Sequence, residues 1–356
     1  MGAGVASSSR VDSIWRRSVS TEQSEVRLSR GEATNPAWIT ARSWPTVLRI
    51  STGLIALIGL AGVAWWRSGA DLRRVVELLG QAHWGYVAMA FAAYYGSFPL
   101  RAWRWHRLLS QLPTHARSIR SYHLLRPYLY GWLLNCALPA KVGELYRSYL
   151  AHRRLQTSLG TIVGTVLVER TADFLFLAAL FPLVAVLALG TDPGRPILLL
   201  QLVAVFTSIA LVAGLFALRR LGRFLGILPA FLQRPAQTLA SGLLVDRRTG
   251  IALGISTLPL WLLEGLRVYA ESRALDLYLS PPLTLLVALV AALLTTVPLT
   301  PAGVGAVELG IASTLALLGI PIEQAIALAL LDRFVAYWSV FPVAGVPWLI
   351  DHLRGS

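Results

Sequence analysis

The stretch LLNCALPAKVGE at residues 133–144 decides the fold of this chain, because an apolar run stops there at a proline and leads through a glycine to a carboxylate. A related stretch, LLTTVPLTPAGVGAVE, lies at residues 293–308. Both contain Pro-Ala-x-Val-Gly followed by a glutamate, and proline and glycine are the residues that interrupt helices. An acid–arginine pair inside an apolar segment follows each stretch: Glu169-Arg170 and Asp332-Arg333. We therefore predict two related broken helices that face a shared polar site.

Composition places the chain in a membrane. Hydrophobic residues make up 55% of the sequence and charged residues 14%, whereas soluble domains carry about a quarter charged residues. Several apolar runs reach the roughly 20 residues needed to cross a bilayer. The net charge of +14 comes from arginines between those runs, with Lys141 as the only lysine, which is the pattern of the positive-inside rule. We therefore expect an all-α polytopic protein of the cytoplasmic (inner) membrane and no nucleic-acid partner.

The apolar runs divide the chain into a tail and one transmembrane domain. Residues 1–46 are rich in Ser, Arg, Thr and Glu, which predicts a disordered cytoplasmic tail, and residues 47–351 form the domain. Two broken elements at 121–153 and 283–318 are too interrupted for ordinary spans, so we expect re-entrant segments there. About six full spans are predicted at residues 47–66, 83–100, 157–189, 197–218, 250–270 and 325–350.

The arginines of the loops orient these spans. Seven arginines lie between the N-terminus and Arg49 and six in residues 219–248, against one in each of the loops 190–196 and 271–282. The positive-inside rule then places both termini in the cytoplasm. The units at about 83–189 and 250–350 consequently cross the membrane in opposite directions, an inverted repeat of the kind found in alternating-access carriers. The basic and aromatic cluster that follows the second span, residues 101–107, is expected at headgroup level.

Charges inside apolar segments are the candidate functional groups. A charge at the bilayer centre costs at least about 2.5–3.5 kcal/mol, so it should face a cavity or a partner. Arg170 is three residues before Asp173, which fits either a substrate site or a self-neutralising pair, and Glu264 with Arg267 leaves the same two interpretations. The broken helix ends add free N–H groups and partial positive charge, which suit an anion such as a lipid phosphate.

The sequence lacks the motifs of the common membrane enzymes. It has no His-Glu-x-x-His, no Gly-Lys of a P-loop and no Asp-x-Asp pair that would hold a metal and a nucleotide sugar. Residues 303–308 imitate a dinucleotide-binding fingerprint, but the third glycine and the βαβ context are absent. The six histidines show no metal-ligand spacing. We therefore expect no metal, no cofactor and no catalytic residue.

In their order and spacing these motifs resemble the lysylphosphatidylglycerol synthase transmembrane-region family, over roughly residues 50–350. The matching positions are Asn135, Leu138, Pro139, Gly143, Glu144, Arg147, Glu169, Arg170, Asp173, Pro298, Pro301, Gly303, Gly305, Glu308, Arg333, Tyr337 and Trp338. Ala302 stands where the family often has glycine, and Lys141 where arginine is common. The resemblance implies a flippase-like region that moves or handles lipids or lipid-linked headgroups. Because the sequence ends at Ser356 without a soluble aminoacyl-transfer domain, we expect no synthesis of aminoacyl lipid.

The residues and the resemblance lead to one hypothesis and two alternatives. The hypothesis is a flippase or carrier that moves a phospholipid or lipid-linked headgroup between leaflets, with membrane lipids as its partners. The first alternative is an accessory membrane protein or enzyme of polyprenyl, glycolipid or aminoacyl-lipid metabolism that works beside a glycosyl or aminoacyl transferase. The second alternative is a structural scaffold. A homo-oligomer is compatible with each of these functions. The candidate substrate-binding residues are Glu144, Arg147, Glu169, Arg170, Asp173, Glu308 and Arg333. The candidate hinge residues of the broken helices are Pro139, Gly143, Pro298, Pro301, Gly303 and Gly305.

Overall fold

The computed structural model describes residues 69–112, 119–190, 194–221, 245–295 and 300–355, with short pieces between 233 and 243. By its internal contacts the chain divides into residues 1–56, which lie outside the described part, and residues 57–356, to which everything below refers. Every regular element in the described residues is a helix, so the predicted all-α class is confirmed. The predicted tail (1–46), the first span (47–66) and Pro298 lie outside the described residues.

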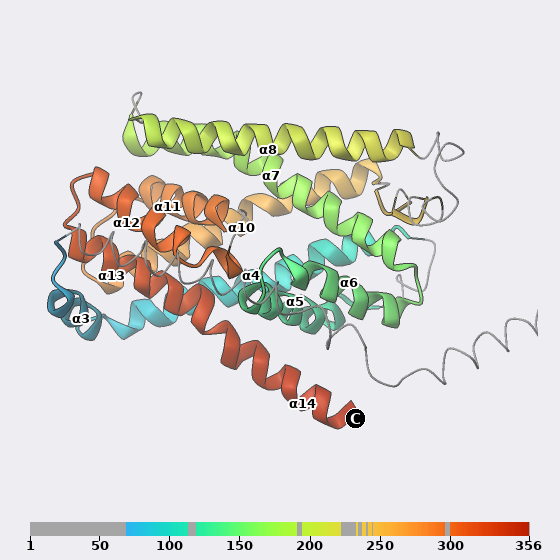
Figure 1. Ribbon diagram of the computed structural model, residues 1–356, viewed down its shortest axis with the longest axis horizontal. Helices are drawn as coiled ribbons and strands as arrows, with labels where there is room; N and C mark the ends of the chain where they lie inside the picture. Colours follow the sequence, from blue (N-terminus) through green and yellow to red (C-terminus); the bar gives the residue numbers. More distant parts are fainter. Residues whose placement is uncertain are drawn as a thin grey trace, which may run out of the picture. The chain divides into compact units, whose positions relative to one another are not determined.

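Eleven α-helices are described, and short 3-10 or π-helical turns adjoin some of them (Figure 1). In chain order the α-helices are α3 (Leu72–Gly80), α4 (Trp84–Leu109), α5 (Leu125–Ala137), α6 (Val142–Leu155), α7 (Leu159–Leu189), α8 (Gly194–Leu221), α10 (Arg247–Ala274), α11 (Pro281–Leu294), α12 (Ala306–Leu317), α13 (Ile322–Arg333) and α14 (Val346–Gly355). The 3-10 turns are η2 (Ser121–Leu124) and η4 (Pro301–Gly303), and the π-helical turns are η5 (Phe334–Trp338) and η6 (Phe341–Gly345).

Four segments among the described residues are long and apolar enough to cross a bilayer. They are Leu159–Leu189, Gly194–Gly214, Arg247–Ala274 and Ile322–Arg354, and they overlap the last four predicted spans. Large apolar side chains on α8 point outward, with Leu199 63% and Phe206 68% exposed, as lipid-facing helices require. The chain is therefore a multi-pass membrane protein, whereas the total of six spans and the opposite orientation of the two units stay predictions.

Helix α4 differs from the span predicted for residues 83–100. It continues to Leu109, so Arg101 and Arg104 belong to its interior and not to a loop after it. The side chains of Arg101 and Arg104 are 12% and 0% exposed, and each is paired with a carboxylate. The headgroup position of residues 101–107 stays a prediction, and the structure adds that carboxylates on α7 and α10 hold these two arginines against the protein. Arg107, in contrast, is exposed beside Trp103.

The first break separates α5 from α6 at residues 138–141, as predicted. Pro139 cannot continue a helix, and Ala140 and Lys141 then adopt left-handed backbone angles with φ of 60° and 56°. The amide of Asn135 marks the new start, because its Oδ1 accepts a hydrogen bond of 2.9 Å from the N–H of Gly143. Gly143 has a packing role and is not itself part of the break, since a Cβ there would lie 1.7 Å from the carbonyl oxygen of Gly131 on α5.

The second break lies between α11 and α12 and uses the same chemistry. Ala302, which follows Pro301 as Ala140 follows Pro139, is also left-handed, with φ of 46°. Gly303 and Gly305 follow with φ of 71° and 86°, angles that favour glycine. Residues 296–299 of this connection are outside the described part. Two helix–break–helix elements of similar backbone geometry thus stand where the sequence repeat predicts them.

The last span, Ile322–Arg354, is one helix with two wide turns in it. The π-helical turns η5 and η6 lie in its middle, and η6 contains Pro342. From η5 the Tyr337 hydroxyl donates a hydrogen bond of 3.1 Å to the carbonyl oxygen of Cys136 in the first element. Just before η5, Arg333 Nη1 donates to the carbonyl oxygen of Ala302 in the second element at 3.4 Å. One helix therefore contacts both helix–break–helix elements.

The surrounding helices pack on one another and on the two helix–break–helix elements. Helices α4 and α10 lie along each other, and Figure 1 shows α8 beside α7, where Ser208 Oγ donates to the Phe174 carbonyl at 3.0 Å. The apolar cluster around Phe181 joins α7 and α8 to α11 through residues such as Leu286, both 0% exposed. Helix α14 packs on the first element, since Trp348 donates to the Tyr146 hydroxyl at 3.0 Å. These contacts hold the two breaks at fixed positions around a common space.

Candidate functional site

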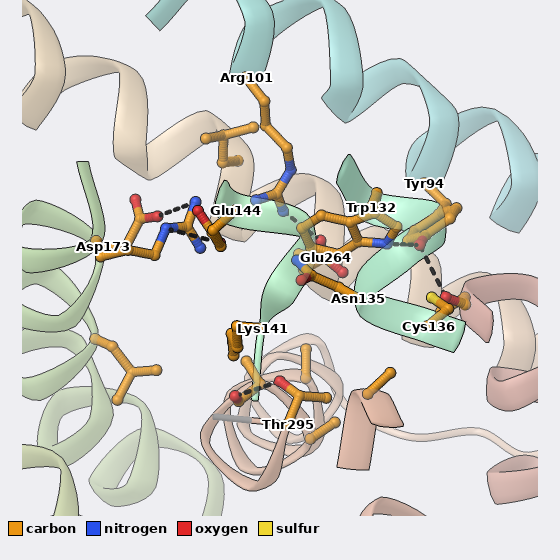
Figure 2. Close-up of a pocket in the computed structure, with 18 of the residues that line it drawn as sticks. Tyr94, Arg101, Trp132, Asn135, Cys136, Lys141, Glu144, Asp173, Glu264 and Thr295 are labelled. Carbon is orange, nitrogen blue, oxygen red and sulfur yellow. Dashed lines mark hydrogen bonds and ion pairs between the residues drawn. The ribbon is translucent and has the colours of Figure 1, made fainter. Parts of the chain in front are cut away.

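Both breaks line one cavity of about 170 Å³ (Figure 2). A cavity needs about 10–15 Å³ to hold one water, so this volume has room for several waters or for a small polar group such as a phosphate ester. The first element contributes Asn135, Leu138, Lys141 and Glu144 to the wall. The second contributes Thr295, Thr300 and Ala302. The sequence repeat therefore corresponds to a shared space, with α4, α7, α10 and residues near Arg333 forming the rest of its wall.

The wall of the cavity is amphipathic. Charged side chains lie beside an apolar surface that α7, α10 and α11 supply. The apolar lining residues are Phe174, Leu177, Leu260, Trp261, Ala288, Ala291 and Ala292. Such a wall can hold a polar group at one side and hydrocarbon at the other.

A first arginine–carboxylate cluster closes one side of the cavity. It consists of Arg104, Arg147, Arg170, Glu144, Glu169 and Asp173, from α4, α6 and α7. Asp173 binds Arg104 at 2.7 Å and Arg170 at 3.3 Å. Glu144 binds Arg147 at 2.7 Å and lies 3.6 Å from Arg170. The cluster ties the helix after the first break to two long helices.

Glu169 is the buried centre of this first cluster. Its carboxylate is 0% exposed and accepts from the Tyr128 hydroxyl at 2.9 Å, from Arg147 at 2.9 Å and from Arg170 at 3.2 Å. The guanidinium of Arg147 also lies over the rings of Trp105 and Tyr128, at 4.8 and 4.4 Å. Cation–π contacts of desolvated arginine contribute roughly 2 kcal/mol, so Arg147 is held on several sides.

A second arginine–carboxylate cluster lies across the cavity. It consists of Arg101, Arg267, Arg333, Glu264, Glu271 and Asp332, from α4, α10 and α13. Glu264 binds Arg101 at 2.7 Å and Arg267 at 3.2 Å, which joins α4 to α10. Arg267 further binds Glu271 at 3.0 Å and Asp332, while Arg333 binds Asp332 at 2.7 Å. Helix α4 thus supplies one arginine to each cluster.

The two acid–arginine pairs of the repeat have equivalent places in the two clusters. In each pair the acid is buried, with Glu169 0% and Asp332 1% exposed, and the arginine that follows lines the cavity. Arg170 reaches back to its own acid and to Glu144 of the first element, and Arg333 to its own acid and to the backbone of the second element. The pairs therefore connect the long helices to the breaks.

The seven predicted substrate-binding residues have three kinds of position. Glu144, Arg170, Asp173 and Arg333 line the cavity. Arg147 and Glu169 lie behind its wall, as the buried supports of the first cluster. Glu308 is outside the lining, because its Oε2 accepts a hydrogen bond of 2.7 Å from the Gly305 N–H at the start of α12. Substrate binding by any of them remains a proposal.

Several lining residues were not among the predicted site. Arg101 was assigned to the headgroups, and Glu264 with Arg267 was left between two interpretations; all three line the cavity. Glu271, fully buried against Arg267, lies in a segment predicted as a connection. The signal for Glu271 is its spacing, because it follows Arg267 by four residues and Glu264 by seven, on one face of a helix.

The fold and the site define a multi-pass helical membrane protein with a charged cavity between two broken helices. The chain belongs to the lysylphosphatidylglycerol synthase TM region family, whose pattern matches residues 51–344, so the resemblance seen in the motifs is confirmed. It is 30% identical over 215 residues to a UPF0104 membrane protein of Methanocaldococcus jannaschii, covering 58% of this chain and 89% of the relative. It is 26% identical over 330 residues to a UPF0104 membrane protein of Methanothermobacter thermautotrophicus, covering 83% of this chain and 94% of the relative.

Proposed function

We propose that this protein is a lipid flippase or carrier of the cytoplasmic membrane, with both termini in the cytoplasm. The observation that carries the proposal is the cavity shared by the two breaks, which has ionised walls although the surrounding helices are apolar. Polar sites of this kind, at irregular backbone inside a membrane domain, are where secondary carriers bind substrate. The family supports the proposal, because its description names a lysylphosphatidylglycerol synthase.

The substrate class follows from the lining. A phospholipid or lipid-linked headgroup would occupy the charged part of the cavity and its chains the apolar part beside Leu177 and Leu260. Arg170 and Arg333, already held by carboxylates, would offer further N–H donors to the headgroup without moving far. The proposal assigns no catalytic residue and no cofactor, so movement would be passive or coupled to an ion.

A cavity-filling variant tests the proposal without changing any charge. Ala292 lines the cavity, so Ala292→Phe should reduce headgroup movement at least tenfold, because the ring would occupy the substrate's place. Ala213→Phe makes the same change on the exposed surface of α8 and should leave the rate within twofold of wild type. The measurement is the rate at which headgroup-labelled phospholipid crosses liposome bilayers that contain the purified protein.

Two results would contradict the flippase. One is a rate in wild-type liposomes equal to that in protein-free liposomes, and the other is equal rates for the two alanine variants. If, in addition, cells without the protein lose a modified lipid, the accessory role in polyprenyl, glycolipid or aminoacyl-lipid metabolism is supported instead.

A further inference from the structure

One cation in the wall of the cavity has no ionic partner among the described residues. The first cluster contains three arginines and three carboxylates, and so does the second, so each is formally neutral. Every arginine of the lining has a carboxylate within 4 Å. Lys141 also lines the cavity, yet its ammonium group has neither an ion pair nor a hydrogen bond within the part of the chain that the structure describes. Lys141 is therefore the cation of the lining that has no carboxylate partner among the described residues.

The backbone holds Lys141 at the cavity. Ala140 and Lys141 are consecutive left-handed residues, a conformation that is unfavourable for residues other than glycine. Lys141 is also the residue from which α6 starts, so the free N–H groups and partial positive charge of that helix end lie beside it. In the view of Figure 2, Lys141 and Thr295 lie on one side of the pocket and Arg101 on the other. Strained backbone therefore places an unpaired cation next to a helix N-terminus.

An ammonium group has three donors and strongly prefers a partner when water is scarce. Arg170, in the same wall, has a buried Nε without a hydrogen-bond acceptor among the described residues. The Arg170 Nε lies 3.6 Å from the carboxylate of Glu144, beyond hydrogen-bond distance, so this N–H and the Lys141 ammonium can both still donate to an anionic oxygen. A phosphate oxygen suits them, because helix N-termini, lysine and arginine are the groups that bind phosphate in proteins.

The source of that phosphate follows from the surroundings of Lys141. Its neighbours Leu138 and Val142 are apolar and 41% and 38% exposed, so hydrocarbon can lie directly beside the ammonium group. Given the proposed function, we infer that Lys141 binds the phosphate of a phospholipid headgroup and anchors it in the cavity. The phosphate of the substrate would thereby supply the partner that Lys141 lacks among the described residues.

Ligand binding to the purified wild-type protein and three variants tests this inference. The probes are dihexanoyl-phosphatidylglycerol, dihexanoylglycerol, which lacks the phosphate, and inorganic phosphate, each titrated against the detergent-solubilised protein with the shift in thermal unfolding as readout. Lys141→Gln should weaken binding of the phosphatidylglycerol at least tenfold, and Lys141→Arg should keep it within threefold. Arg153→Gln removes one positive charge from the exposed far end of the same helix and should leave binding unchanged.

Each result decides the inference. Equal binding of the phosphatidylglycerol to wild type and Lys141→Gln overturns it, as does equal binding of the phosphatidylglycerol and the diacylglycerol to wild type. If inorganic phosphate binds as tightly as the lipid, the ligand is a free anion and the assignment to a lipid headgroup is wrong. The proposed function can fail separately, since liposomes without protein-dependent lipid movement would refute transport while leaving the Lys141 site intact.

Discussion

Replacement of Glu169 by glutamine is the most direct test of how the first cluster is held together. Glutamine has the same shape, so the change opens no cavity and removes only a negative charge. The side-chain carbonyl oxygen of the glutamine can still accept from the Tyr128 hydroxyl. Its NH₂ group then faces the Arg147 guanidinium, so two hydrogen-bond donors oppose each other where Glu169 accepted a hydrogen bond. The cluster is left with three arginines and two carboxylates in a buried position.

The magnitude follows from the burial of the partners. Glu169 is 0% and Arg147 3% exposed in their side chains, so water cannot replace the missing charge. Removal of one partner from a buried ion pair destabilises proteins by about 3–5 kcal/mol. Glu144 still binds Arg147 at 2.7 Å, which favours the lower end, and we expect Glu169→Gln to lower the free energy of unfolding by about 3 kcal/mol.

The measurement is the free energy of unfolding of the purified protein in mixed micelles with increasing denaturing detergent. Glu77→Gln is the matched control, since it removes a glutamate from the pair with Arg74, where both side chains are 57% exposed. That loss should stay below about 1 kcal/mol. In the Glu169→Gln background, Arg147→Met should recover part of the lost stability, because it removes the surplus charge. Equal, small losses for Glu169→Gln and Glu77→Gln would refute the reasoning, since they would show that water reaches the cluster.

Two further predictions concern the helix starts. Gly143→Ala should destabilise the protein by several kcal/mol or prevent folding, because the new Cβ would overlap the Gly131 carbonyl. Gly96→Ala in α4 is the control, since its Cβ meets no atom within 4 Å and the change should be neutral or stabilising by up to about 1 kcal/mol. The measurement is the free energy of unfolding of each variant. Asp246, before the start of α10, accepts from the hydroxyl and the N–H of Thr249, which lowers its pKa. The stability that Asp246 contributes is therefore present above the ordinary aspartate pKa and is lost as the pH falls through the lower pKa of the folded state. Asp246→Asn can still cap the helix but cannot titrate, so it should remove this pH dependence from the acid side of a curve of stability against pH. An unchanged acid side of that curve would contradict the assignment.

The positions of the breaks could be predicted from the sequence because proline and glycine act locally. Pro139 and Pro301 stand in the pattern Pro-Ala-x-Val-Gly, in which the alanine after each proline is left-handed, whereas Pro99, Pro182 and Pro259 lie inside helices. The whole pattern therefore marks the breaks, and the acid–arginine pairs after it had to be paired or face a cavity in an apolar segment. The family followed from the order of the same residues. None of these conclusions needed knowledge of tertiary contacts.

The partners of the charges could not be predicted, because they are set by packing between distant helices. Arg101 directly follows an apolar run, and from the sequence alone an arginine buried in the protein cannot be distinguished from one among lipid headgroups. The partner that distinguishes them is Glu264, 163 residues away. Glu308 looks like the counterpart of Glu144, but the left-handed Gly305 presents an N–H that binds it. Lys141 was read only as a departure from a family pattern, since its lack of a partner is visible only when every neighbour is placed.

The wide turns η5 and η6 lie beside residues that contact both helix–break–helix elements. A π-helical turn carries one residue more than an α-turn, and such turns inside α-helices are frequent at functional sites. Tyr337 and Arg333, at and just before the first of these turns, contact the backbone of opposite breaks. A change in the backbone of this one helix would therefore act on residues beside both breaks, which lie far apart in the sequence.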